Sequence, residues 1–314
     1  IFDAIYDSSI KLILTRHEQG AIHMADGYAR ATGKTGVVLV TSGPGATNTV
    51  TGILTAQMDS IPLVILTGQT ITSALGKDAF QEADVFGGTA PFVKHSYLVK
   101  EPNDIPRIVK ESFYLAATGR PGTVLIDLPK DITSAPCEAT HEEAEMDLPG
   151  YSFPDKGKAV DIKAAADILN NAKRPLLLVG HGTLISKANK EVLQLAELLQ
   201  TPVTTTLMGK GAFPENHELS VGMLGMHGTA YANRCVSNCD VIFSIGSRWD
   251  DRITPAKIEK FCPTAKKLHL DIDKAEINKV VMPDVSILGD AKTCLKELLP
   301  LIKSSEATKP WLKQ

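Results

Sequence analysis

The chain has 314 residues, of which 43% are hydrophobic and 22% charged, a composition typical of a globular protein with room for two domains. Its formal net charge of -3 excludes a strongly basic surface, and no apolar run approaches the ~20 residues of a membrane helix, so neither nucleic acid nor membrane is expected as a partner. The five cysteines form no CxxC pair, which argues against a zinc site and for reduced thiols in a cytosol-like compartment.

Strand and helix patterns alternate from the start of the chain. Phe2, Ile5 and Tyr6 predict that a helix is already under way at Ile1, so we expect further sequence before it. Continuous apolar runs predict buried parallel strands, and apolar spacings of three and four predict helices. In the first half, strands are expected at 12–14, 36–41, 62–67 and 123–128, and helices after Glu18, at 46–58 and at 105–118.

The second half repeats this order after a change in composition. Residues 133–158 contain three prolines and an acidic run, which predict a surface linker with a solvated charged face. Strands are then expected at 175–179, 202–206, 240–245 and 267–272, and helices at 161–172, 186–200, 228–238 and 291–302. The pattern predicts an α/β protein with two three-layer parallel-sheet domains, at 1–135 and 161–314, joined by a linker at 136–160.

Glu18 lies where the predicted strand at 12–14 gives way to a helix. Ligands of open α/β sheets bind outside the carboxyl ends of the strands, so a carboxylate here is a candidate for chemistry. The structural alternative is that Glu18 compensates the helix dipole, as most acidic residues of a first turn do. Position alone does not decide between these interpretations.

Several motifs in a fixed order do favour a function. They are Arg16-His17-Glu18-Gln19-Gly20-Ala21, Met24-Ala25-Asp26-Gly27-Tyr28-Ala29-Arg30, Thr41-Ser42-Gly43-Pro44-Gly45-Ala46-Thr47-Asn48, Ala79-Phe80-Gln81-Glu82, Gly119-Arg120-Pro121-Gly122, Asp127-Leu128-Pro129-Lys130-Asp131, Met223-Leu224-Gly225-Met226-His227-Gly228 and Gly246-Ser247-Arg248-Trp249-Asp250-Asp251-Arg252. Together they resemble the catalytic large subunit of acetohydroxyacid synthase (acetolactate synthase), a thiamine-diphosphate enzyme, over essentially the whole chain.

The resemblance implies a pyrimidine-binding domain followed by a flavin-binding middle domain. The implied reaction condenses pyruvate with a second pyruvate or with 2-ketobutyrate, releases CO₂, and gives acetolactate or acetohydroxybutyrate for branched-chain amino-acid synthesis. The implied cofactors are thiamine diphosphate, FAD and Mg²⁺. The family's Gly-Asp-Gly motif, which holds the metal and diphosphate, does not occur in this sequence, so we expect the metal site outside this chain and the chain alone to be inactive.

The resemblance assigns roles to six residues of the first half and one of the second. Glu18 is the catalytic acid that acts on the aminopyrimidine ring, and its carboxyl is expected to be partly desolvated. Pro44, Asn48 and Gln81 contact the coenzyme, whereas Phe80, Lys130 and Arg252 contact substrate. The structural alternatives are a core aromatic for Phe80, a solvated lysine for Lys130, and a salt bridge from Arg252 to Asp250 or Asp251.

The resemblance also assigns a set of flavin contacts, because the family binds FAD in an extended pose. Gly180-His181-Gly182 follows a predicted strand, although the third glycine of GxGxxG is absent, so the motif is weak by itself. The matching positions are Arg120, Gly180, Gly182, Thr204, Thr205, Leu207, Leu224, Met226, His227, Gly246, Arg248, Asp250, Asp271, Ile272 and Asp290.

Partners and alternatives follow from the same resemblance. It implies a homodimer or higher oligomer with active sites between subunits, a small regulatory subunit, and a cytoplasmic location, or the organellar stroma in a eukaryote. Two alternatives stay open: another thiamine-diphosphate enzyme, such as pyruvate oxidase or catabolic acetolactate synthase, and a non-catalytic flavin-binding paralogue. The run Trp249-Asp250-Asp251-Arg252 favours the biosynthetic enzyme.

Overall fold

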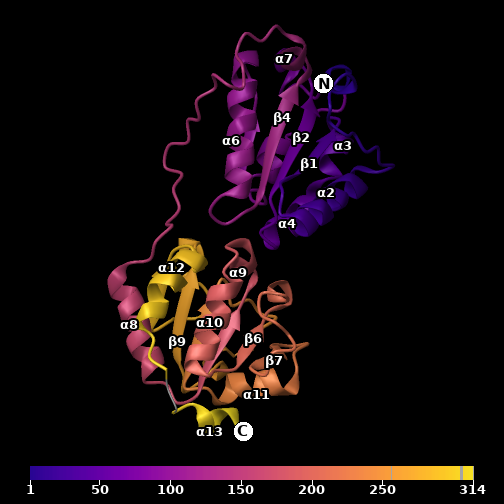
Figure 1. Ribbon diagram of the computed structural model, residues 1–314. Helices are drawn as coiled ribbons and strands as arrows, with labels where there is room; N and C mark the ends of the chain where they lie inside the picture. The colour runs from indigo at the N-terminus through magenta and orange to yellow at the C-terminus, as the bar shows by residue number, and fades with distance from the viewer. Residues whose placement is uncertain (256, 305–306, 314) are drawn as a thin grey trace. The chain divides into compact units, whose positions relative to one another are not determined.

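The protein is described here by a computed structural model that covers residues 1–255, 257–304 and 307–313. The chain divides into two compact units, Ile1–Tyr151 and Ser152–Gln314 (Figure 1). Both are α/β, and every strand pairing in both sheets is parallel. The predicted α/β class with two parallel sheets is therefore confirmed. No helix of the described chain is both long and apolar enough to cross a membrane.

The first unit is built on a four-stranded sheet in the order β1-β2-β4-β3. Its strands are β1 (Gly36–Val40), β2 (Leu63–Gln69), β3 (His95–Leu98) and β4 (Thr123–Pro129). Its helices are α1 (Phe2–Tyr6), α2 (Glu18–Thr32), α3 (Pro44–Thr47), α4 (Val50–Met58), α5 (Val85–Thr89), α6 (Ile105–Ala117) and α7 (Lys130–Ser134). Short 3₁₀ turns lie at Thr72–Ala74 and Pro102–Asp104.

Helices cover both faces of this sheet, with α6 on one face and α2 with α4 on the other (Figure 1). Alternate strand residues such as Val124 and Ile126 pack against Ile108 and Leu115 of α6. On the other side α2 and α4 cross closely, since a Cβ built at Gly52 would lie 2.1 Å from Ile22 Cγ2. The two apolar faces explain why the strands are continuous apolar runs.

The predicted strand at 12–14 is wrong. Leu12, Ile13 and Leu14 have no strand assignment and are 52%, 58% and 92% exposed. A three-residue apolar run forms a strand only where a neighbour pairs with its backbone, and β1 stands at the edge of the described sheet without one on that side. Glu18 is nevertheless the first residue of a helix, α2.

The acidic stretch after α7 is attached to the first unit by its backbone. Asn103 Oδ1 accepts from Glu138 N–H at 2.9 Å, and Glu111 Oε1 accepts from Asp147 N–H at 2.8 Å. Leu148 and Tyr151 pack against the core under α6. The acidic side chains themselves are exposed, as expected for a solvated charged face.

The second unit contains a six-stranded sheet in the order β10-β9-β8-β5-β6-β7. Its strands are β5 (Pro175–Val179), β6 (Val203–Thr205), β7 (Ser220–Met223), β8 (Val241–Ile245), β9 (Lys266–Asp271) and β10 (Val285–Leu288). Its helices are α8 (Ala159–Asn170), α9 (His181–Ile185), α10 (Asn189–Leu199), α11 (Ala230–Asn238), α12 (Ala291–Leu298) and α13 (Lys309–Leu312). Short 3₁₀ turns lie at Leu207–Gly209, Ile258–Lys260, Lys274–Glu276 and Leu299–Leu301.

The strand order of the second unit reverses between β5 and β8. From β5 the chain moves outward through β6 to β7, and from β8 it moves the other way through β9 to β10. One face of the sheet packs against α8, α10 and α12, and the other packs against α11 and the Trp249 loop. Such a reversal leaves a crevice at the carboxyl ends of the two central strands, where ligands of open α/β sheets bind.

Candidate active site

Most predicted coenzyme and substrate residues of the first unit follow the carboxyl ends of its strands. Pro44 and Asn48 follow β1, Phe80 and Gln81 lie in the loop after β2, and Lys130 follows β4. All five are exposed. Because the strands are parallel, these loops emerge at one edge of the sheet, which makes the edge a candidate binding surface.

Glu18 belongs to the same edge through the turn after β1. Asn48 Nδ2 donates a hydrogen bond to Glu18 Oε2 at 3.0 Å. A Cβ built at Gly45 would lie 3.6 Å from Glu18 Oε1, so the turn backbone passes directly beside the carboxylate. The predicted catalytic acid and a predicted coenzyme contact, 30 residues apart, therefore touch each other.

The environment of Glu18 favours the ionised carboxylate. Its own backbone N–H at the start of α2 lowers the pKa most, followed by the Asn48 amide, while burial opposes them only weakly. The side chain is partly exposed. The dry environment expected for a catalytic acid is thus not supplied by this chain itself, and the lowered pKa is the helix-start effect described by the structural alternative.

Gln81 is joined to the turn after β1 by close backbone packing. A Cβ built at Gly43 would lie 2.6 Å from the Gln81 carbonyl oxygen and 2.9 Å from its Cα, so only glycine fits. Both residues have positive φ, 56° for Gly43 and 55° for Gln81. The two predicted coenzyme loops therefore lie against each other at this edge.

Phe80 stands out from the loop surface. Its side chain is 89% exposed, which rejects the alternative of a core aromatic for the described chain. Lys130 is also exposed, at the first position of α7. Both side chains are therefore accessible to a bound molecule.

The sequence analysis did not predict the side chains that hold the loop between β2 and α5, residues 70–84, which contains Phe80 and Gln81. Asp127 on β4 and Gln69 on β2 form a buried pair at 2.9 Å, and Asp131 bonds to Thr72. The available signal was the pair of acids that flank Lys130 in the motif Asp127-Leu128-Pro129-Lys130-Asp131.

In the second unit, backbone approaches backbone at the crevice between β5 and β8. A Cβ built at Gly180 would lie 2.2 Å from the Gly246 carbonyl oxygen, and one at Gly182 would lie 2.8 Å from Gly246 Cα. Gly182 N–H donates to that same carbonyl at 3.0 Å. Only glycine fits at these positions, because a side chain would meet the facing backbone. The reversal of strand order is also the place where ligands of open α/β sheets bind.

The remaining predicted flavin positions of this unit also lie at or just after carboxyl ends of strands. Thr204 and Thr205 end β6, Asp271 ends β9, and Asp290 is the N-cap of α12, accepting from Thr293 N–H at 3.0 Å. The others occupy loops after β6, β7 and β9: Leu207, Leu224, Met226, His227 and Ile272. Arg120 belongs to the first unit, where its Nε donates to Ser60 Oγ at 2.9 Å.

Arg252 forms the salt bridge named as its structural alternative. Its guanidinium lies 2.7 Å from Asp250 Oδ2, and Arg248 approaches the same oxygen at 3.3 Å. Arg252 is 63% exposed, so its guanidinium remains reachable from solvent. One carboxylate thus orients two predicted ligand-binding arginines in one loop.

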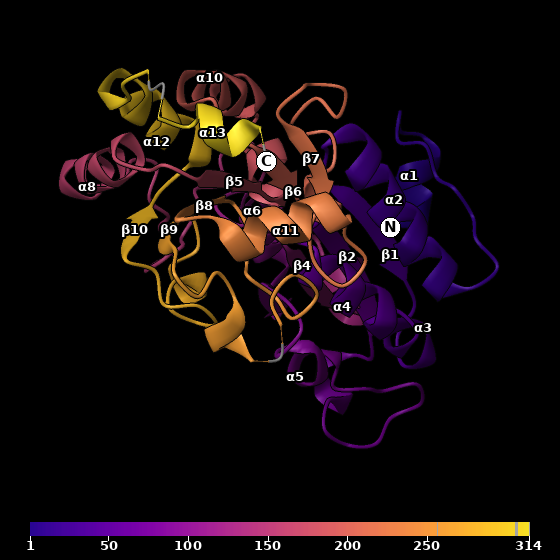
Figure 2. The ribbon, with the colours of Figure 1, turned by 90° about the horizontal axis from the view of Figure 1, so that it is seen from below.

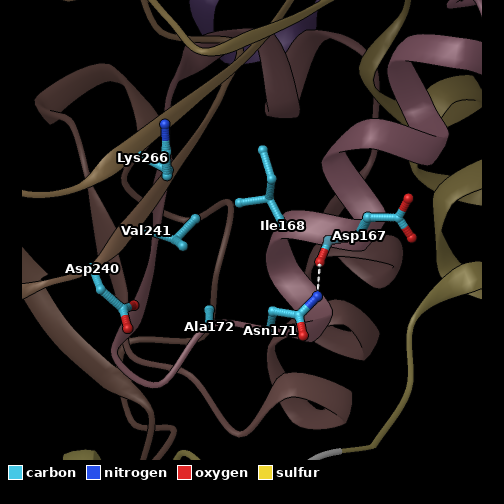
Figure 3. A pocket seen from close by; sticks show the side chains of 7 residues that line it. All are labelled: Asp167, Ile168, Asn171, Ala172, Asp240, Val241 and Lys266. Atoms are coloured by element: carbon cyan, nitrogen blue, oxygen red, sulfur yellow. Dashed lines mark hydrogen bonds between the residues drawn. The ribbon is translucent and has the colours of Figure 1, made fainter.

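A separate hollow in the second unit lies away from these residues. It has a volume of about 430 Å³ and lies beside the end of α8 and the amino-terminal ends of β8 and β9 (Figure 3). Its lining residues are Asp167, Ile168, Asn171, Ala172, Asp240, Val241 and Lys266. None of them is a predicted site residue, and the hollow is at the opposite edge of the sheet from the glycine crevice.

The described residues contain no metal centre of the common kind. Across 1–255, 257–304 and 307–313, no group of three or more His, Cys, Asp or Glu side chains is placed to hold an ion.

Comparison with known proteins assigns the family. Residues 1–87 match the thiamine pyrophosphate enzyme N-terminal TPP binding domain, and residues 162–298 match the thiamine pyrophosphate enzyme central domain. The chain belongs to the thiamine pyrophosphate enzymes. The matched segments contain Glu18 with the turn after β1 in one unit, and the glycine crevice in the other.

Relatives with curated names extend the similarity to nearly the whole chain. The chain is 50% identical over 307 residues to the probable acetolactate synthase large subunit of Methanocaldococcus jannaschii. The aligned residues cover 97% of this chain and 52% of the relative. It is 49% identical over 312 residues to the acetolactate synthase isozyme 3 large subunit of Escherichia coli, covering 99% and 54%. The chain is thus homologous to acetolactate synthase large subunits and spans about half the length of these relatives.

Proposed function

We propose that the full-length protein condenses pyruvate with a second 2-keto acid, either pyruvate or 2-ketobutyrate, with loss of CO₂. The products are acetolactate or acetohydroxybutyrate, which serve branched-chain amino-acid biosynthesis. The observation that best supports this proposal is the contact between Glu18 and Asn48 beside the Gly43–Gly45 turn, at the edge where Gln81 also lies. Homology to acetolactate synthase large subunits supplies the choice of reaction.

In this proposal Glu18 exchanges a proton with the aminopyrimidine ring. Thiamine diphosphate, when bound, supplies the carbon nucleophile that attacks pyruvate. Asn48 orients the Glu18 carboxylate by its hydrogen bond, and the turn at Gly43 and Pro44 is proposed to present backbone to the flat ring. A carboxylate whose hydrogen bonds are already made loses little order when the ring arrives.

The pKa of Glu18 in this chain differs from what the proposed proton exchange requires. In this chain it is lowered, whereas proton exchange near neutral pH requires a raised pKa. Groups that cover the partly exposed carboxylate and exclude water would raise it. From the resemblance to acetohydroxyacid synthases we propose that the complete site lies at the interface of a homodimer or higher oligomer, where a second subunit would cover Glu18.

Substrate contacts are proposed for Phe80, Lys130 and Arg252. The exposed ring of Phe80 suits an apolar contact with the methyl group of pyruvate. The Lys130 ammonium is positioned to attract an anionic keto acid. The planar guanidinium of Arg252, held by Asp250, suits the carboxylate of the second keto acid.

FAD is proposed to occupy the glycine crevice of the second unit. This location is proposed because ligands of open α/β sheets bind where the strand order reverses, and Gly180, Gly182 and Gly246 lie at that reversal. Arg248, in the loop after β8 of the same unit, is the proposed partner of its diphosphate. The flavin is expected to be structural, and Mg²⁺ is expected to bind outside this chain.

The wider setting is proposed from the same homology. We expect a small regulatory subunit as partner, because the relatives are named large subunits. A cytoplasmic location, or an organellar stroma in a eukaryote, fits a biosynthetic enzyme.

The decisive experiment measures acetolactate formation by the full-length protein with pyruvate, thiamine diphosphate, Mg²⁺ and FAD. Glu18→Gln should lower turnover by about 100- to 10,000-fold, the range for loss of a general acid or base. Glu142→Gln, an exposed glutamate of the acidic stretch after α7 with no proposed role in the site, is the matched control. Normal activity of Glu18→Gln would refute the assignment, and reduction of the flavin by pyruvate would favour a pyruvate oxidase instead.

A further inference from the structure

The loop between β2 and α5, residues 70–84, is fastened at its beginning by Asp131. Thr72 N–H donates to Asp131 Oδ1 at 3.0 Å, and the Thr72 hydroxyl donates to Asp131 Oδ2. These bonds hold the pKa of Asp131 below its usual range, with the Thr72 hydroxyl as the largest cause. The carboxylate follows β4 by two residues, so a neighbouring strand end fixes where the loop departs.

Asp127 holds the far end of the same loop indirectly, through the side chain of Gln69. Gln69 Nε2 donates both to Asp127 Oδ2 at 2.9 Å and to the carbonyl of Ala83 at 2.8 Å. Thr67 Oγ1 donates to the other Asp127 oxygen at 2.7 Å. Asp127 is only 1% exposed, so both of its carboxylate oxygens accept hydrogen bonds from side chains of β2 and not from solvent.

The middle of the loop is held by its own carboxylate and by the neighbouring turn. Glu82 accepts from the backbone N–H groups of Gly76 and Ala79, which closes the loop on itself. Gln81 packs against Gly43 of the turn after β1. The result is a loop with fixed ends in which the Phe80 side chain is exposed to solvent. The loop leads into α5, whose label marks its place in Figure 2.

We infer that Asp127 and Asp131 are positioning residues that clamp the two ends of the loop 70–84 and thereby set the place of Phe80 and Gln81. Asp127 lies near the carboxyl end of β4 and Asp131 lies two residues after that end, with Lys130 between the two acids in the sequence. The role in catalysis rests on the proposed function, since Phe80 and Gln81 are proposed substrate and coenzyme contacts. The clamp itself rests only on the hydrogen bonds within the first unit.

The test compares Asp127→Asn and Asp131→Asn with Asp78→Asn in the full-length protein. Asp78 lies in the same loop, is exposed, and has a φ of 54°, which asparagine also tolerates, so it is a matched control. Backbone amide exchange should become at least ~10-fold faster across residues 72–84 in both clamp variants, with β2 and β4 still protected. Turnover should fall about 10- to 100-fold, because a misplaced contact raises the barrier of the chemical step.

Two further measurements separate positioning from general instability. Asp131 is partly exposed, so Asp131→Asn is expected to fold even if Asp127→Asn does not. Thr72→Val removes the partner hydroxyl, and combining it with Asp131→Asn should add little to either single change. Unchanged exchange in Asp131→Asn would overturn the clamp, and a loosened loop with normal turnover would overturn its positioning role. A wild-type protein without acetolactate activity would instead defeat the proposed function and leave the exchange result standing.

Discussion

Different interactions hold the carboxyl-end edges of the two sheets in place. In the first unit the edge consists of loops whose side chains bond to one another, as in the Glu18–Asn48 and Thr72–Asp131 pairs. In the second unit the central feature is backbone packed on backbone at Gly180 and Gly246, beside the ion pairs that Asp250 makes in the loop after β8. Carboxylates and amides that bond to one another can exchange protons with a bound molecule. Close backbone packing between glycines fixes the geometry of the edge but supplies no group that titrates. The contrast matches a catalytic role for one edge and a cofactor-holding role for the other.

The largest expected effect comes from adding one methyl group to the glycine crevice. Gly246 has a φ of 60°, and a Cβ there would lie 2.7 Å from Gly182 Cα. Gly246→Ala therefore combines backbone strain with a clash against backbone, and should destabilise the protein by about 3 kcal/mol and weaken FAD binding at least tenfold. Denaturant unfolding and flavin titration would measure both.

Gly211→Ala is the matched control for this change. Gly211 also has a positive φ, 88°, but a Cβ there meets nothing within 4 Å. It should cost only about 1 kcal/mol from backbone strain and leave flavin affinity unchanged. Equal effects of the two variants would show that strain alone, and not the close packing at the crevice, sets the outcome.

The next effect concerns the buried carboxylate of the first edge. Burial raises the pKa of Asp127 to about 6, although hydrogen bonds from Thr67 and Gln69 oppose the shift. The folded protein therefore binds this proton more tightly than the unfolded chain, so Asp127 contributes stability that is present at low pH and lost as pH rises from about 4 through about 6. Two pKa units correspond to about 3 kcal/mol.

Asp127→Asn removes this titration. The difference in unfolding free energy, variant minus wild type, should rise by about 3 kcal/mol between pH 4 and pH 7, whatever its starting value. Asp78→Asn, on the exposed part of the same loop, should show a difference that does not change with pH. A constant difference for Asp127→Asn would mean that its carboxyl titrates normally in the folded protein.

The sequence predicted the strands that are continuous apolar runs, including the edge strand β1, and missed the edge strands β3, β7 and β10. The run at 175–179 matches β5, and 36–41 contains β1, because continuous apolar residues are typical of a covered parallel strand. The edge strand β3 (His95–Leu98) carries polar residues and was not expected. The helix expected at 46–58 is two helices, α3 and α4, separated at Asn48 and Thr49.

The site shows a similar division between what local sequence encodes and what it does not. Motifs placed Glu18 and Asn48 as candidates, but only the folded chain shows that they bond to each other. The acids that hold the loop before α5 lie about 60 residues away from their partners, so no local pattern could pair them. The expected desolvation of Glu18 also depends on groups beyond this chain, which its own sequence does not describe.

A smaller effect is expected at the contact between Asn48 and Glu18. The Asn48 amide lowers the pKa of Glu18, so Asn48→Ala should raise that pKa. The acidic limb of the pH–rate profile should move to higher pH, and turnover at pH 7 should fall by less than about tenfold, because the pair is partly exposed. Glu18→Gln should abolish the limb. A limb that stays in place in Asn48→Ala would assign it to another group.

The smallest change in stability is expected at Arg252, which makes it the cleanest probe of substrate choice. Its exposed pair with Asp250 should contribute less than about 1 kcal/mol to folding. Its backbone carbonyl, which accepts from Met226 N–H at 2.9 Å, is retained in Arg252→Gln, so the loop around Gly225 should stay in place.

A change in the ratio of acetohydroxybutyrate to acetolactate by Arg252→Gln, measured with both keto acids in competition, would therefore report on the guanidinium and not on the fold. An unchanged ratio would leave Arg252 with only its ion pair. The proposed role of the second unit would then be limited to cofactor binding, and the proposed contacts with substrate would all lie in the first unit.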